Sequence, residues 1–310
     1  MSERSLPLIA WLAFFAFVVA MLALDLGVLH RSTRTVSMRE AARWSAIWVG
    51  LAIGFDLLVW ATLGAGPALD FATAYVIEKS LSVDNLFVFL VVFGALRIGP
   101  EHQHRVLFWG ILGALVMRGA MIAAGLELLS RFHWLIYVFG GVLVVTGLKL
   151  LRGWYRGEDD EEAALENGRL FRFVRRWIPS TTSLHGGRFF VIENGRRVAT
   201  PLLVALVLVE LTDVVFALDS IPAVVAVSRD PFIVFTSNVF AILGLRNLYF
   251  LLAGAVEKLH HLKLGLSAVL VFVGAKMALV DVVSIPPLVS LAIVTTMLAL
   301  PFVVGRARRA

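Results

Sequence analysis

The chain has 310 residues, of which 59% are hydrophobic and only 16% are charged. Soluble domains carry about a quarter of charged residues, so this composition excludes an ordinary soluble protein and indicates a membrane protein. The sequence has no cysteine, which excludes disulfides, thiolate zinc sites, iron–sulfur clusters and thiol redox chemistry. The net charge of +6 is typical of cytoplasmic arginines in a membrane protein, and no basic stretch interleaved with aromatic residues indicates nucleic-acid binding.

Apolar segments long enough to cross a bilayer, about 20 residues each, recur along the whole chain. We expect nine of them, at residues 8–29, 41–62, 72–96, 106–130, 134–151, 200–224, 232–254, 264–281 and 285–304. The predicted fold is therefore all-α, a polytopic bundle of transmembrane helices that forms a single membrane domain over residues 1–310.

Arginines and lysines concentrate in alternate connections between these segments and at the end of the chain. Because basic connections stay on the cytoplasmic side, this distribution predicts an N-terminus outside the cell and a cytoplasmic C-terminus. The long polar segment at residues 152–199 then becomes a cytoplasmic linker. It contains an acidic run at 158–162 and an amphipathic stretch at 170–177, and it is where we expect a protein partner to bind, if there is one.

The order of polar residues in segments three to five returns in segments six to eight. Segments three and six each have two carboxylates six positions apart, followed directly by an amide or a hydroxyl residue: Glu78, Asp84 and Asn85 in the first, and Asp213, Asp219 and Ser220 in the second. Segments four and seven each carry an arginine, and segments five and eight share a Gly-x-Lys ending. Units of three spans insert with opposite orientations, so the pattern predicts an inverted repeat at about 72–151 and 200–281.

Ionisable residues at the centre of a membrane helix cost about 2.5–3.5 kcal/mol each on insertion scales, so their number here requires an explanation. The acids are Glu78, Asp84, Glu210, Asp213 and Asp219, with Asp25, Asp56 and Glu127 less central; the bases are Lys79, Arg118, Lys149, Arg246 and Lys276. One explanation is structural ion pairing, in which the bases only balance charge. Eight acids against five bases still leave three negative charges, which protons or a bound cation would have to balance.

The chemistry of the donor atoms narrows the choice of cation. Carboxylate, amide and hydroxyl oxygens suit Mg²⁺, Ca²⁺ or Mn²⁺ rather than Zn²⁺ or Cu⁺. The candidate ligands are Glu78, Asp84, Asn85, Glu210, Asp213, Asp219 and Ser220. Since residues six positions apart lie on different faces of a straight helix, we also expect segments three and six to be kinked or unwound at their acidic stretches.

The stretches at 78–89 and 210–223, together with 238–246, resemble the TerC family of integral membrane proteins. That family is named for tellurium resistance and includes Alx-type manganese exporters of the bacterial inner (plasma) membrane. The resemblance covers the chain from about residue 25 to the last segment. It implies efflux of Mn²⁺, with Glu78, Asp84, Glu210, Asp213 and Asp219 as ligands. The metal, with Ca²⁺ and Mg²⁺ as alternatives, would be cargo rather than a permanently bound cofactor.

Three classes of function compete at this point. A secondary transporter exporting a divalent cation, with or without coupling to protons, accounts for the acids, and its partners are the bilayer, the ion and protons. An intramembrane enzyme is not expected, because the sequence lacks Gly-x-Gly-Asp, His-Glu-x-x-His and Gly-x-Ser-x-Gly. The third class is a membrane scaffold or assembly factor, linked to tellurium resistance or to metal supply for exported proteins.

Overall fold

The computed structural model describes residues 8–27, 37–132, 134–156, 174, 176–178, 180–181, 184–193, 195–253, 259–279, 281–282 and 285–307. Its helices are α1 (Leu8–Gly27), α2 (Met38–Leu63), α3 (Ala65–Ala95), α4 (Pro100–Arg131), α5 (Leu135–Arg156), α8 (Pro201–Val225), α9 (Pro231–Ile242), α10 (Leu245–Ala253), α11 (Leu259–Ala278) and α12 (Pro287–Ala307). A single 3₁₀ turn η1 (His185–Gly187) and an antiparallel hairpin of β1 (Phe190–Glu193) and β2 (Arg196–Ala199) precede α8. The bundle is helical as predicted, but the all-α prediction missed this hairpin.

Each expected membrane segment coincides with a helix, and the seventh coincides with the pair α9 and α10. By length and composition α2, α4, α5 and α8 can cross a membrane, and α9 with α10, bent by 42°, forms a fifth span when the pair is counted as one. The apolar stretches of α1, α11 and α12 are shorter, and α3 carries four charged residues along its length. The chain is therefore a helical protein with several candidate spans, and the count of nine stays a prediction.

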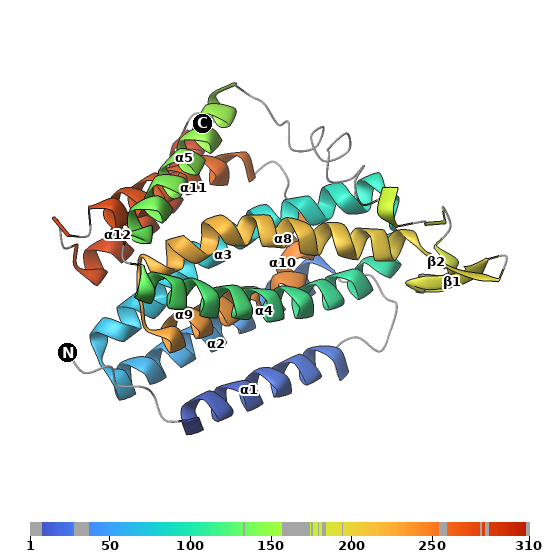
Figure 1. The fold of residues 1–310 in the computed structure, drawn as a ribbon, viewed down its shortest axis with the longest axis horizontal. Helices are drawn as coiled ribbons and strands as arrows, with labels where there is room; N and C mark the ends of the chain where they lie inside the picture. Colours follow the sequence, from blue (N-terminus) through green and yellow to red (C-terminus); the bar gives the residue numbers. More distant parts are fainter. Residues whose placement is uncertain are drawn as a thin grey trace.

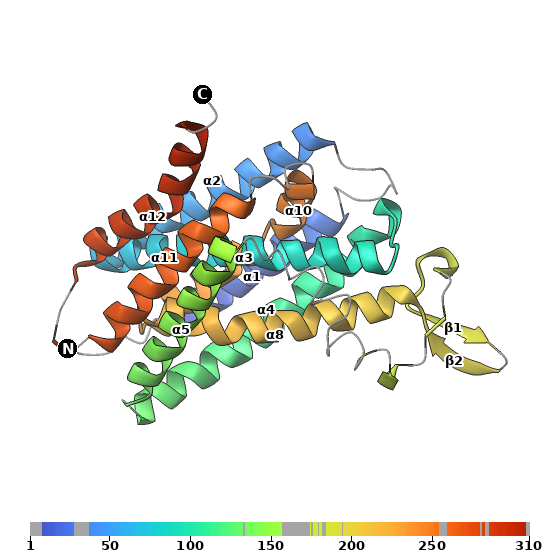
Figure 2. The same ribbon diagram turned by 90° about the horizontal axis from the view of Figure 1, so that it is seen from above.

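Three long helices lie side by side at the centre of the bundle, α3, α4 and α8 (Figures 1 and 2). One apolar cluster contains residues between 86 and 98, from the last part of α3 and the turn that follows it. It joins them to the beginnings of α4 and α8. A second cluster joins the first half of α3 to the ends of α4 and α8. It follows that α4 and α8 run in the same direction and that α3 runs against both. The polar residues at mid-length of these helices lie between the two apolar clusters.

The sequence predicts that α3 and α8 are kinked or unwound, and the unwinding does not occur. The helix α3 is continuous from Ala65 to Ala95, and α8 continues past Pro222 to Val225. The chain instead leaves helical geometry between α9 and α10, where Gly244 has a φ of +81°. Only glycine adopts this conformation without strain, and a Cβ there would also lie 2.6 Å from the Trp48 ring.

A lysine from α3 binds the end of α9 at this break. Lys79 Nζ donates hydrogen bonds to the backbone oxygens of Ala241 at 3.0 Å and Leu243 at 3.4 Å. The last carbonyls of a helix have no partner within the helix and carry partial negative charge. Lys79 therefore stabilises the broken helix rather than neutralising a carboxylate, which differs from the charge-balancing role expected for it.

The helices α5 and α11 cross at closely packed glycines, beside α12 at one end of the bundle (Figure 1). A Cβ on Gly140 would lie 2.8 Å from the backbone oxygen of Gly274, and a Cβ on Gly274 would lie 2.7 Å from that of Gly140. A Cβ on Gly147 would likewise lie 2.8 Å from the backbone oxygen of Ser267. Because the earlier residue of α5 meets the later residue of α11, the two helices are antiparallel.

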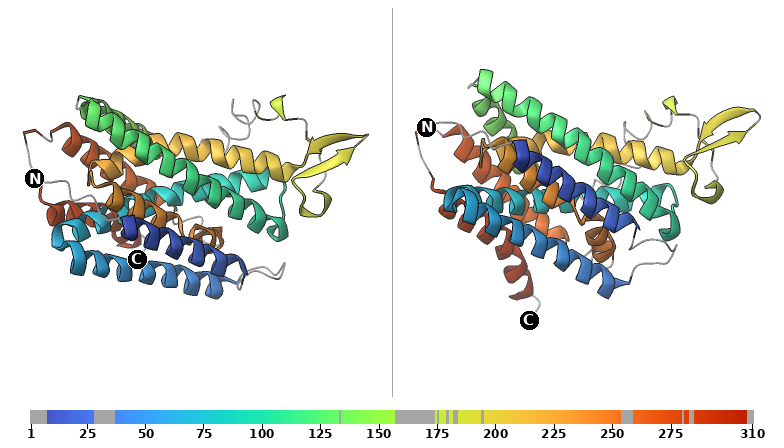
Figure 3. Two further views of the ribbon diagram at one scale, coloured as in Figure 1. Left: turned by 60° about the horizontal axis from the view of Figure 1, so that its bottom comes forward. Right: turned by 90° about the horizontal axis from the view of Figure 1, so that it is seen from below.

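The helices α1 and α2 lie along the outside of the bundle (Figure 3). They join it through aromatic side chains, such as Phe55 against Phe240 with ring centroids 4.9 Å apart and Phe14 against Phe232 at 5.9 Å. Such contacts contribute about 0.5–1.5 kcal/mol each beyond the area they bury. The helix α2 is packed chiefly against α3 and α10, and the aromatic side chains of α1 contact α9.

The part of the linker that the structure describes lies against the beginning of α4. Arg105 Nη1 donates to the backbone oxygen of Gly187 at 2.8 Å, and its guanidinium stacks over the Phe189 ring. The α3–α4 turn and the linker are thus at the same end of the bundle, as expected for two segments on one side of a membrane. The acidic run at 158–162 and most of the stretch at 170–177 lie outside the described residues.

The glycine crossing gives a test of the packing. Gly140→Ala would force α5 and α11 apart and should lower the free energy of unfolding by about 1–3 kcal/mol, the usual cost of overpacking. Gly141→Ala is the matched control, because nothing lies within 4 Å of a Cβ at that position. Thermal denaturation in detergent compares the two. Equal melting temperatures would contradict the close approach of these helices.

The capping lysine gives a second test. Lys79→Met removes the cation from the end of α9 and should lower the free energy of unfolding by about 1–2 kcal/mol, as found for cations at partly buried helix ends. Amide hydrogen exchange of residues 243–248 should become faster. Lys149→Met is the control, since that side chain is exposed on α5. Unchanged exchange in Lys79→Met would show that the break does not depend on the lysine.

Candidate cation site

Arg118 of α4 is the centre of a buried polar cluster, and only 2% of its surface is exposed. Its Nε and Nη2 donate to the two carboxylate oxygens of Asp213 at 3.0 and 2.8 Å. Its Nη1 pairs with the carboxylate of Glu78, which is fully buried. One guanidinium therefore joins α3, α4 and α8 at mid-length.

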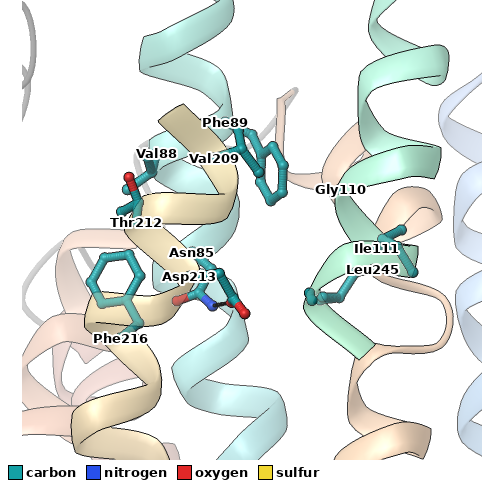
Figure 4. A pocket seen from close by; sticks show the side chains of 11 residues that line it. Asn85, Val88, Phe89, Gly110, Ile111, Val209, Thr212, Asp213, Phe216 and Leu245 are labelled. Carbon is teal, nitrogen blue, oxygen red and sulfur yellow. Dashed lines mark hydrogen bonds between the residues drawn. The ribbon is translucent and has the colours of Figure 1, made fainter. Parts of the chain in front are cut away.

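Asn85 completes the contacts of Asp213. Its Nδ2 donates to Asp213 Oδ1 at 2.8 Å, and the two side chains point toward each other from α3 and α8 (Figure 4). They line a cavity of about 20 Å³ together with Thr212 and apolar residues that include Phe89 and Phe216. A cavity of that size holds about one water molecule. The polar atoms therefore face a space large enough for one small ion or one water.

Glu210 stands one helical turn before Asp213 on α8. Residues three positions apart share a helix face, as expected for these two. Among the described residues, Glu210 Oε2 is buried without a hydrogen-bond partner. The carboxylate lies directly against Gly113 of α4, where a Cβ would overlap it. Gly113 therefore provides the space for Glu210, and the acid remains available for a proton or a cation.

The charges of this cluster do not balance. Arg118 pairs with Glu78 and Asp213, and Glu210 stands one turn from Asp213, so these four described groups have a net charge of −2 when each is ionised. In the part of the chain that the structure describes, no three carboxylate or imidazole groups are close enough to hold a metal ion together. The Arg118 guanidinium lies between Glu78 and Asp213. In the described arrangement, the side chain of Arg118, and not a metal ion, is bound by two of the predicted ligands.

The remaining predicted ligands are less well placed by the structure. The side chains of Asp84 and Asp219 lie outside the described residues. Ser220 of α8 is 1% exposed, and its hydroxyl has no hydrogen-bond partner among the described residues. Ser82, one turn after Glu78, is in the same situation. Buried hydroxyls of this kind can supply further oxygen ligands.

Two of the other predicted charge-balancing residues, Lys149 and Lys276, lie away from the cluster. Lys149 is exposed on α5. Lys276 of α11 donates to the Ser290 hydroxyl of α12 at 2.9 Å. Arg246 is buried at the beginning of α10, directly after the helix break. Among the contacts described, Arg118 is thus the base that pairs with Glu78 and Asp213.

Two features of the acidic helices escaped the sequence analysis. Asp70 belongs to α3, where it accepts a hydrogen bond from the Ser228 hydroxyl and lies near Lys276 and Asp230. The third segment was expected to begin at residue 72, so Asp70 was placed outside it, although the apolar run around it could have extended the segment. Gly113 was not singled out, because no pattern within one chain shows which glycine faces an acid.

Comparisons with known proteins relate the chain to integral membrane proteins. The model of the family described as integral membrane protein TerC matches residues 63–310. A membrane protein of Myxococcus xanthus described as uncharacterized is 60% identical over 93% of this chain and 89% of its own length. A protein of Escherichia coli K12 is 44% identical over 98% of this chain and 96% of its own length, and its provisional name is membrane-bound redox modulator Alx.

A membrane protein of Rickettsia bellii, also described as uncharacterized, is 36% identical over 94% of this chain and 95% of its own length. No solved structure matches the chain. Both the family model and these full-length similarities include α3, α4 and α8, which carry the buried acids and Arg118. The chain belongs to the TerC family of integral membrane proteins.

Proposed function

We propose that this protein is a secondary transporter that exports divalent metal cations, foremost Mn²⁺, in exchange for protons. The observation that supports this proposal is the buried excess of carboxylates at mid-length of α3, α4 and α8. Among the contacts that the structure describes, Glu78 and Asp213 pair with Arg118, and together with Glu210 these groups carry a net charge of −2 when ionised. Such an excess is costly in a membrane unless it serves the passage of ions.

The size of this excess negative charge fits an exchange of metal ions for protons. A charge of −2 is balanced by one divalent cation or by two protons. Metal binding requires deprotonated carboxylates and so releases protons, which allows the same groups to bind either. The donors are hard oxygens, including the Asn85 amide and the Thr212 hydroxyl at the cavity, and these favour Mn²⁺, Mg²⁺ or Ca²⁺.

An inverted repeat is part of the proposal, and the helix contacts support it. In the proposed repeats α3 corresponds to α8, α4 to α9, and α5 to α11. The contact between α4 and α8 then corresponds to the contact between α9 and α3, and both are present. The α3–α8 and α5–α11 contacts each join a helix to its own counterpart. The same correspondence relates the Gly147–Ser267 approach to the Gly274–Gly140 approach. Transporters built from inverted repeats hold their substrate where the repeats meet, near the membrane midplane. We place the cargo there, in a protein of nine spans with a cytoplasmic C-terminus in the bacterial inner membrane.

A scaffold or assembly factor is the competing proposal, and the β-hairpin is the feature that favours it. Phe190 and Ile192 of β1 are 56% and 73% exposed, on the same face of the strand. Such side chains can bind a partner protein. The redox role in the name of the Escherichia coli relative would need another chemistry here, because this chain has no cysteine.

Transport is tested with purified protein in liposomes loaded with a manganese-sensitive dye. Asp213→Asn and Glu210→Gln should each reduce the initial rate of Mn²⁺ flux by about tenfold or more, since a loss of only about 1.4 kcal/mol of binding free energy gives that factor. An imposed pH gradient should change the flux of the unsubstituted protein, whereas Ca²⁺, Mg²⁺ and Zn²⁺ define its selectivity.

The control is Glu127→Gln, which changes an exposed carboxylate on α4 that pairs with Arg131 at 2.7 Å. It should transport at the normal rate. All variants are first compared for membrane insertion and melting temperature, so that a loss of folding is not mistaken for a loss of transport. Normal Mn²⁺ flux in folded Asp213→Asn and Glu210→Gln would exclude these carboxylates as the path of the ion and would favour the scaffold.

A further inference from the structure

We propose that Arg118 is a tethered competitor of the cargo: its guanidinium occupies the carboxylates that the divalent cation needs, and it must leave them for the cation to bind. The inference rests on the proposed function and concerns how the same site selects and releases its ion. It assigns to Arg118 a role different from balancing charge, because a competitor weakens cation binding whereas a structural partner supports it.

The hydrogen bonds of Asp213 are the first argument. Both of its oxygens accept from Arg118, and Oδ1 also accepts from Asn85. Bidentate pairing of this kind is the strongest that a carboxylate makes with a side chain. A cation such as Mn²⁺ needs lone pairs of the same oxygens, at about 2.0–2.6 Å by analogy with Mg²⁺ and Ca²⁺. Asp213 cannot keep both contacts to the guanidinium and also bind the metal through the same lone pairs.

Position is the second argument. The guanidinium lies between Glu78 of α3 and Asp213 of α8, and these two acids hold equivalent places in the proposed repeats. A metal bound by both would have to lie where Arg118 lies now. Two positive groups a few ångströms apart in a site of low polarity repel each other strongly. Occupation by Arg118 and occupation by metal therefore exclude each other.

The neighbouring space is the third argument, since a displaced competitor needs partners. Glu210 Oε2 has no hydrogen-bond partner among the described residues and lies against α4 beside Gly113. It is on the same helix as Asp213 and one turn away. In this proposal Arg118 exchanges its bonds to Asp213 for bonds to Glu210. Glu210 then receives the guanidinium when the cation takes Asp213.

The test measures binding of Mn²⁺ to detergent-solubilised protein by the electron paramagnetic resonance signal of the free ion. Arg118→Ala should bind Mn²⁺ more tightly than the unsubstituted protein, by about tenfold to a hundredfold, because removal of one partner from a buried ion pair releases the other. Its transport rate should nevertheless fall, because the ion is no longer displaced. Arg131→Ala is the matched control: it removes an arginine from the same helix that is also paired, but exposed, and should leave the affinity unchanged.

Added guanidinium ion separates competition from a structural role. At millimolar concentration, far below the molar range that unfolds proteins, it should compete with Mn²⁺ for Arg118→Ala and restore weak binding. It should have no effect on the unsubstituted protein, and urea, which has the same shape without the charge, should have no effect on either. Weaker or equal Mn²⁺ binding in folded Arg118→Ala, or binding that guanidinium does not change, would overturn the proposal.

If Arg118→Ala does not fold, Arg118→Lys decides the question. Lysine keeps the charge but cannot form the bidentate contact, so Mn²⁺ affinity should rise by about threefold or more, and equal or lower affinity would overturn the inference. The unsubstituted protein keeps the two hypotheses apart. If it transports Mn²⁺ while these variants show no gain in affinity, only the competitor role fails. If it neither binds nor transports Mn²⁺, the proposed function fails first.

Discussion

The ion pairs of Arg118 with Asp213 and Glu78 are the constraint on which the arrangement of the central helices depends. Removing one partner of a buried ion pair costs about 3–5 kcal/mol, because the other charge is left in a medium that cannot solvate it. The three helices can therefore slide or rotate against one another very little. Whatever moves during function must either preserve these contacts or replace each of them with another charge.

The surrounding structure is organised to keep this polar layer isolated. Apolar clusters close it on both sides along α3, α4 and α8. Adjacent residues of α3 serve different neighbours, since successive side chains on a helix point about 100° apart: Glu78 faces Arg118, whereas Lys79 binds the broken end of α9. The layer thus connects the ion pairs of three helices to the break between α9 and α10.

The helices and the buried acids were predictable from the sequence, because a bilayer requires long apolar helices and makes every charge within them conspicuous. The partners of those charges were not. Which acid Arg118 meets depends on the lateral and axial positions of three helices, and one chain does not encode these in its periodicity. The unwinding was assigned to α3 and α8 on the assumption that all acids face one ion. In the structure Glu78 and Asp213 share an arginine instead, so their helices have no need to unwind. The hairpin was missed because its strands are only four residues long.

A tethered arginine would also solve a problem that any exchanger of divalent ions faces. After the cargo leaves, the carrier has to return with its site empty, and a net charge of −3 from Glu78, Glu210 and Asp213 would make that step costly in a membrane. With Arg118 in the site the charge falls to −2, and two protons then make it neutral. The arginine thus reduces the number of protons needed for the return from three to two, which matches the charge of one divalent ion. For these four described groups, the charge would match exchange of one metal ion for two protons.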